Sequence, residues 1–388
     1  LAAPLSKNQG NPPMRTAFIA LLLATTPALA ATPFEPADLY RISMTDNVEV
    51  SPDGSRVLFT RMQFDIQTDR RQTEWWLADV GKGGLAKRLL IPAQAGASGA
   101  VWAPDGKRVA WVAPWLGKPQ IWVMDVDAGV GRPITSGTAA PGNLAPQNLA
   151  WSPDGTRIAF TALVEAKPPT VAGMPEKPAG ATWAPDPRII TDFRWRTNEG
   201  GYIKPGADHL FVVAASGGTP AQLTKGDTDQ ISGGASWAPD GKTLVYAAQV
   251  RPGNDRIANE SDLYRIAADG GAPERLTAID GSEDKARLSP DGQWLAWIGQ
   301  PKTTKFYAQP GLWLRRVAGG DPVHLTAALD RPVQAFRWTA DGKALHVFYS
   351  DAGFTRVATI PAAGGAPRIT VPAVGGTRLY LPSSGGDW

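Results

Sequence analysis

A short turn sequence occurs six times in this chain of 388 residues: Pro-Asp-Gly in five copies and Ala-Asp-Gly in the last. Pro presets φ, Asp can hydrogen-bond its own backbone and Gly tolerates positive φ, so the triplet favours a tight turn. The turn aspartates are Asp53, Asp105, Asp154, Asp240, Asp291 and Asp341. Successive copies lie 52, 49, 86, 51 and 50 residues apart, so a unit of about fifty residues is repeated six times.

The segment after each turn has the pattern of a buried strand. In the second unit Val109 and Trp111 stand three and five residues after the turn glycine, with Ala110 between them. Residues two apart share one face of a strand, so both faces of this strand are apolar. Two weaker strands follow in each unit, and most units end in an apolar residue and Thr, such as Leu223-Thr224. With the strand before the turn, each unit has four antiparallel strands.

Four strands in a period near fifty residues are typical of a propeller blade, because a ring of blades buries faces that one blade cannot bury alone. We therefore predict an all-β fold, a β-propeller of four-stranded antiparallel blades, six complete plus the start of a seventh. The blades are expected at 46–92, 98–137, 148–227 with an insertion at 163–205, 231–280, 285–328 and 334–372.

The last residues repeat the pattern once more. The sequence "LPSSGGDW" (381–388) resembles "LSPDGQW" (288–294), which predicts a partial seventh blade at 376–388. A sheet that stops there has an open edge, which proteins usually avoid, and the prediction is therefore a truncated chain. The alternative is a six-bladed ring with a frayed tail.

Residues 1–30 have the composition of a targeting segment. Met14 and Arg15 precede a short apolar stretch at 17–24, and Ala28-Leu29-Ala30 fits a signal-peptidase site. We expect a signal peptide over Met14–Ala30, an upstream extension before it and a mature start at Ala31. The mature chain is then periplasmic or secreted, with no membrane anchor after cleavage. The alternative is a buried core helix, for which a propeller has no use.

Composition limits the partners and the chemistry. The formal net charge is +3 with charges of both signs interspersed, without the basic face of a nucleic-acid-binding protein, so no nucleic-acid partner is expected. The absence of Cys excludes disulfides. The three histidines, His209, His324 and His346, are far apart in sequence and are interpreted as structural. No metal and no cofactor are predicted, because the turn explains the repeated aspartates without calcium.

The insertion in the third unit is the one irregular region. It is rich in Pro and continues as "ITDFRWRTNEGGYIK" (190–204). Arg194, Arg196, Glu199 and Tyr202 are candidate substrate-binding residues, because a long loop on a rigid scaffold often carries function. The alternative is an ordinary strand pair whose Arg side chains face solvent.

Two segments resemble a known family. "FEPADLYRISMTDNVEVSPDGSRVLFTR" (34–61) is similar to the opening of exported serine peptidases of the prolyl oligopeptidase family, in the acylaminoacyl-peptidase and dipeptidyl-peptidase branch. Residues 188–224 resemble the mid-propeller segment of the same branch, and the likeness covers about 34–388. The resemblance implies a seven- or eight-bladed propeller that caps an α/β-hydrolase domain with a Ser-Asp-His triad.

This sequence departs from that family in two ways. It contains no Gly-x-Ser-x-Gly motif, so we expect these residues to lack the hydrolase domain, and no catalytic residue can be carried over. It also lacks the adjacent Glu pair that some members use for the substrate amino terminus, and Glu199 is a lone acid. We expect the chain to be inactive alone and to meet its short peptide substrate through the missing domain.

Two functional hypotheses follow. The first is the substrate-gating propeller of an exported peptidase that acts on short peptides. The alternative is a stand-alone periplasmic TolB-like propeller that binds a protein partner. The oligomeric state is not predicted.

Overall fold

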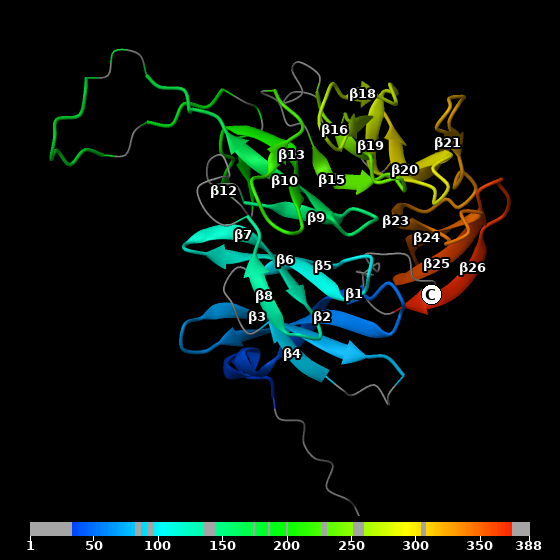
Figure 1. The fold of residues 1–388 in the computed structure, drawn as a ribbon, viewed down its shortest axis with the longest axis horizontal. Helices are drawn as coiled ribbons and strands as arrows, with labels where there is room; N and C mark the ends of the chain where they lie inside the picture. Colours follow the sequence, from blue (N-terminus) through cyan, green and yellow to red (C-terminus); the bar gives the residue numbers. More distant parts are fainter. Residues whose placement is uncertain are drawn as a thin grey trace, which may run out of the picture.

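The computed structural model describes residues 33–374, apart from 82–86, 92–96, 136–144, 227–230, 251–259, 304–307 and eight positions between 172 and 200. A short 3-10 helix, η1 (Pro36–Arg41), precedes the first sheet. The described chain then forms six four-stranded antiparallel sheets that follow one another around a ring (Figure 1).

The sheets are built from consecutive chain segments. The first three blades contain β1 (Ser43–Val50), β2 (Arg56–Asp65), β3 (Arg70–Asp79) and β4 (Lys87–Ile91); β5 (Ser98–Trp102), β6 (Arg108–Trp115), β7 (Lys118–Asp125) and β8 (Val130–Pro133); and β9 (Gln147–Trp151), β10 (Arg157–Glu165), β13 (Gly206–Ala214) and β14 (Ala221–Gln222). The last three contain β15 (Ser232–Trp237), β16 (Thr243–Ala248), β17 (Asp262–Ala267) and β18 (Glu274–Arg275); β19 (Gly281–Leu288), β20 (Trp294–Pro301), β21 (Gly311–Arg316) and β22 (Val323–His324); and β23 (Val333–Trp338), β24 (Ala344–Asp351), β25 (Phe354–Pro361) and β26 (Arg368–Val374).

This architecture confirms the predicted all-β propeller and its six four-stranded blades. The segments predicted as a seventh blade (376–388) and as a signal peptide (Met14–Ala30) lie outside the described residues. Within the described residues no helix has the length and apolar character needed to cross a membrane. No sheet in this part of the chain combines strands from the two ends, so the first and sixth blades share no strand.

The second strand of each blade forms the core, as its apolar pattern indicates. In the second blade Val109, Ala110 and Trp111 are all buried, so both faces of β6 are covered. The largest core cluster joins the second and third blades and includes Ile121 of β7 and Phe160 of β10. Burial of apolar surface between neighbouring sheets is therefore what holds the blades in a ring.

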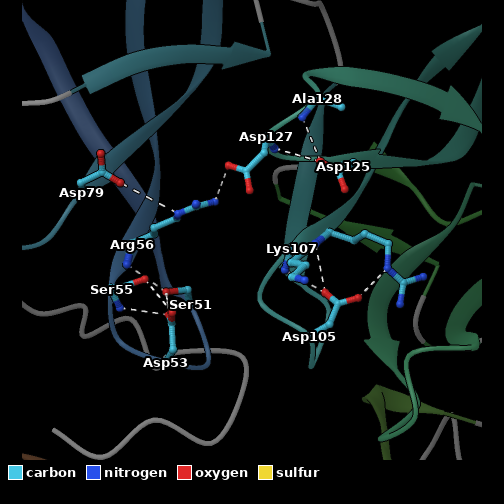
Figure 2. Close-up of polar contacts among 11 residues, drawn as sticks. Ser51, Asp53, Ser55, Arg56, Asp79, Asp105, Lys107, Asp125, Asp127 and Ala128 are labelled. Atoms are coloured by element: carbon cyan, nitrogen blue, oxygen red, sulfur yellow. Dashed lines mark hydrogen bonds and ion pairs between the residues drawn. The ribbon is translucent and has the colours of Figure 1, made fainter.

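The repeated turns have the hydrogen bonds that their sequence predicts. In the first blade Asp53 Oδ1 accepts a bond from Ser51 Oγ at 2.6 Å and another from the backbone N–H of Ser55 at 3.0 Å (Figure 2). The bonds from Ser51 and Ser55 lower the pKa of Asp53 to about 2. The same aspartate-to-backbone bond recurs in the other five turns at 2.8–3.0 Å, which explains the repeated aspartates.

Arginines two residues after the turn glycine join the first four blades. Arg56 reaches Asp127 of the second blade at 2.9 Å (Figure 2). Arg108 donates to the Gly155 carbonyl of the third blade at 2.9 Å, and Arg157 donates to the Gly241 carbonyl of the fourth at 2.6 Å. The fourth, fifth and sixth blades have other residues at this position, so these arginine contacts link the first four blades in sequence.

The tryptophan before the turn also links neighbouring blades. Trp237 Nε1 donates to the Ala150 carbonyl of the preceding blade at 2.9 Å, and Trp102 and Trp151 make the same contact at 3.2 Å. Trp338 of the sixth blade differs, because its buried Nε1 has no hydrogen-bond partner among the described residues. The regular contact between neighbouring inner strands is therefore lost at the fifth and sixth blades.

This difference gives a matched pair of substitutions. Trp237 and Trp338 are equally buried, with 8% and 9% of their surface exposed. We expect Trp237→Phe to lower the free energy of unfolding by about 1 kcal/mol more than Trp338→Phe, because only the first removes a hydrogen bond. Urea unfolding of both variants measures the difference, and equal losses would contradict the assignment of the Trp237 bond.

Candidate functional site on the ring axis

The first strand of each blade, here called the inner strand, borders the axis of the ring. Figure 1 shows β1, β5, β9, β15, β19 and β23 around its centre, where a propeller has its channel. Each inner strand has a register irregularity near its middle. Five of the six irregularities contain an exposed residue in the left-handed region: Asn47, Gly99, Asn148, Gly233 and Lys285. These bulges re-aim the side chains that follow them.

One position on the inner strands is equivalent in all six blades. It lies four residues before the turn aspartate, and in the first blade it is two residues after the left-handed residue. Its occupants are Glu49, Val101, Ala150, Ser236, Arg287 and Arg337. Their partners on the second strands are Leu58, Ala110, Ala159, Val245, Ala296 and His346. Three of the six equivalent residues are charged, and they belong to the fifth, sixth and first blades.

Glu49, Arg287 and Arg337 form what we call the axial charge cluster. Burial lowers the pKa of Arg337 to about 10, repulsion from Arg287 adds to this effect, and Glu49 opposes it. Burial also lowers the pKa of Arg287, and Glu49 again opposes the shift. Charged residues of three blades therefore act on one another electrostatically, and all three come from the equivalent position of their inner strands.

Arg287 combines exposure to solvent with a lowered pKa. Its side chain is exposed to solvent, yet loss of hydration lowers its pKa. Both fit its position on an inner strand, which borders the axis of the ring. Among the described residues Arg287 makes no hydrogen bond and no ion pair within 4.0 Å. A guanidinium has five N–H donors, and the carboxylate of Glu49 acts on this group electrostatically.

The residues predicted from the insertion lie elsewhere in the fold. Arg196 and Tyr202 pair across a short hairpin, β11 (Arg196–Thr197) and β12 (Gly201–Tyr202), whereas Arg194 and Glu199 lie outside the described residues. Tyr202 lies beneath the Arg188 guanidinium at 3.8 Å. The structure thus brings two of the four together on a strand pair with exposed side chains, and their role in substrate binding stays a prediction.

The three histidines contact neighbouring side chains within their blades. His209 Nδ1 lies 3.1 Å from Thr224 Oγ1, His346 Nδ1 lies 2.9 Å from Thr359 Oγ1, and the His324 ring stacks on Trp313 with centroids 4.5 Å apart. Across the part of the chain that the structure describes, no group of three or more His, Asp or Glu residues could hold a metal ion.

The axial charge cluster was missed in the sequence, although a signal was present. Aligned on the turn, the segments "EVSPDG", "RLSPDG" and "RWTADG" have a charged residue where "VWAPDG", "AWSPDG" and "SWAPDG" have a small or apolar one. The alignment predicts which residues are equivalent. Only the ring brings Glu49, Arg287 and Arg337 within electrostatic reach of one another.

Comparisons with known proteins agree with this architecture. No protein-family model matches the chain. A dipeptidyl-peptidase 5 of Porphyromonas gingivalis is 24% identical over 351 residues, which is 86% of this chain and 49% of that protein. The acylaminoacyl peptidase of Pyrococcus horikoshii has a similar fold, with a TM-score of 0.64, 14% identity, and coverage of 87% of this chain and 46% of its own.

A second solved structure matches for most of its own length. The β-propeller domain of the Trilobed protease from Pyrococcus furiosus, described as having an open velcro topology, has a TM-score of 0.55 and 13% identity, with coverage of 87% of this chain and 85% of that one. The chain spans about half the length of the dipeptidyl-peptidase that it matches. The resemblance predicted from residues 34–61 and 188–224 is therefore confirmed: the chain has relatives named dipeptidyl-peptidase 5, and its described residues have the fold of acylaminoacyl peptidase propellers.

Proposed function

We propose that this propeller is the substrate-gating part of an exported serine peptidase that acts on short peptides. The observation that carries the proposal is the match to a dipeptidyl-peptidase over 86% of this chain but only 49% of that protein. The remaining half of such a protein would supply the Ser, His and Asp that acyl transfer needs. The propeller would exclude large substrates and orient small ones.

The structure supports this role through the ring itself. Its axis is bordered by six inner strands, and Glu49, Arg287 and Arg337 occupy the equivalent position on three of them. A channel with charged residues can select among peptides by size and by charge. The alternative, a stand-alone propeller that binds a protein partner, remains a prediction that no feature of the described residues favours.

The proposal is tested on the gene and on its complete product. We expect the reading frame to continue past the Trp388 codon into a Gly-x-Ser-x-Gly motif followed by Asp and His. The complete product should cleave dipeptidyl and aminoacyl chromogenic substrates and leave a folded protein substrate intact, whereas the 388-residue chain should cleave neither. A stop codon directly after Trp388, or peptide turnover by the pure 388-residue chain, would refute the proposal.

A further inference from the structure

In the second and third blades, small apolar residues occupy the equivalent position of the inner strand. Val101 and Ala150 are half-buried and pack against the cores between their blade and the next. Packing is thus satisfied by small apolar side chains at this position. Arg287 and Arg337 replace them in two successive blades, and moving a guanidinium partly out of water costs free energy. Arg287 and Arg337 also repel each other, and Glu49 attracts both.

From this arrangement we infer that Arg287 and Arg337 form a carboxylate-binding site in the propeller channel, which holds a carboxylate group of the peptide substrate. This inference rests on the proposed function, since it names the substrate group that the gate would recognise. The two arginines come from the equivalent position of adjacent blades, and the Arg287 guanidinium has no hydrogen-bond partner among the described residues. Guanidinium donors match the two oxygens of a carboxylate.

The neighbouring charges leave the site positive. Lys285 Nζ donates to the Gln334 carbonyl at 2.6 Å, so this cation is held at the joint between the fifth and sixth blades. Asp284 faces the opposite joint, where its Oδ1 lies close to Gly233 of the fourth blade. Glu49 is the acid of the cluster itself. Counting these three with Arg287 and Arg337, the positive charges exceed the negative by one, which favours an anion.

A short peptide is the ligand that suits this site best. Every peptide with an unmodified end carries one C-terminal carboxylate, and an acidic side chain offers the same group. A long protein segment that threads a narrow ring would bring few such ends to the axis. Recognition of a carboxylate at the axis would therefore favour short peptides over internal protein segments, in addition to exclusion by size.

The test compares two peptides that differ only in this group. The 388-residue chain is titrated calorimetrically with tetraalanine and with tetraalanine amide at low ionic strength. We expect the free acid to bind about tenfold more tightly than the amide. A tetrapeptide amide with one Glu side chain then shows whether a side-chain carboxylate binds in place of a C-terminal one. Equal affinity for acid and amide, or no binding of the acid at 10 mM, would overturn the inference.

Substitution of Arg287 tests whether the preference for the free acid over the amide depends on the axial charge cluster. Arg287→Gln is expected to abolish the tenfold difference, and Arg287→Lys to retain part of it, because Lys keeps the charge and loses the planar fork. The matched control is Arg316→Gln in the same blade, whose guanidinium stacks over Trp294 with its central carbon 4.0 Å from the ring centroid and is exposed. Arg287 is chosen for substitution because it is exposed, whereas Arg337 is half-buried and its replacement would disturb packing more. Thermal unfolding of each variant checks that it is folded.

The outcomes separate this inference from the proposed function. If the acid preference is present and depends on Arg287 while the complete product cleaves no peptide, the carboxylate site stands and the peptidase proposal fails. If the complete product cleaves short peptides while the Arg287→Gln chain keeps its acid preference, the peptidase proposal stands and the site fails. Binding of inorganic phosphate without binding of the acid peptide would also contradict a peptide carboxylate site.

Discussion

Replacing Glu283 by Gln is expected to raise the free energy of unfolding at pH 8 by on the order of 3 kcal/mol, and to change it little at pH 4. The Glu283 side chain is fully buried between the fourth and fifth blades. It accepts a hydrogen bond from Thr277 Oγ1, and Ser261 Oγ donates to its carbonyl at 2.7 Å. Burial raises its pKa from the ordinary 4.5 to about 7, and the nearby charge of Asp262 adds to that rise.

The direction of the effect follows from proton binding. A carboxyl whose pKa is higher in the folded state than in the unfolded state binds more protons when folded. Its contribution to stability is therefore complete below about pH 4.5 and is lost as the pH rises through about 7. Glutamine cannot ionise and does not lose this contribution. Gln120 already shows that an amide oxygen can accept from the corresponding threonine, Thr135, at 2.7 Å.

The measurement is urea unfolding of both proteins at pH 4, 6 and 8. The matched control is Glu274→Gln in the fourth blade, because Glu274 is exposed and pairs with Arg265 at 2.6 Å. An exposed pair contributes little to stability, so the control should show no comparable change with pH. A difference between Glu283→Gln and the unmodified chain that stays constant from pH 4 to pH 8 would show that Glu283 titrates normally.

Substituting Gly206 by Ala is expected to lower the free energy of unfolding by roughly 3 kcal/mol or more. Gly206 begins β13, directly after the insertion, and has φ = +136°. A Cβ at this position would collide with the backbone carbonyl of Val164 and would lie 2.9 Å from Glu165 Cα. Both obstacles are backbone atoms of β10, so a side-chain rotation cannot relieve the contact.

Gly201→Ala is the matched control. Gly201 lies in the insertion hairpin and also has a positive φ, +71°, but no atom lies within 4 Å of its added Cβ. Its cost is therefore only that of a left-handed non-glycine residue, roughly 1–2 kcal/mol. Chemical unfolding of the two variants compares them directly. Similar losses would mean that the chain at Gly206 can move away from β10, and that the base of the insertion is not fixed to the blade.

Much of the fold is determined by residues that are close together in the chain, and it can therefore be predicted from the sequence. Asp53 and its five counterparts act within their own turns, bonding a backbone N–H two residues away. The alternation of apolar residues fixes the faces of a strand such as β6, and the period of about fifty residues fixes the blade. These features require no knowledge of which blades are neighbours, so they predicted the six four-stranded blades correctly.

The candidate site at the ring axis could not be predicted from residues that are close together in the chain. Sequence reasoning selected the insertion because it interrupts the repeat, and the structure places Arg196 and Tyr202 on an exposed hairpin there. It missed Glu49, Arg287 and Arg337 because each occupies an ordinary repeat position, and the charge there becomes visible only when the repeats are aligned on the turn. Their significance lies in their mutual electrostatic effect, which joins residues separated by as many as 288 positions along the chain.

The amino-acid sequence by itself determined the turns, the strands, the blade and the number of complete repeats, because backbone conformation and burial of a strand face are set by residues close together in the chain. Only the tertiary structure decided which residues meet at the axis. Closing the ring brings the first blade to the fifth and sixth, and this places one carboxylate and two guanidinium groups where they share a single electrostatic environment.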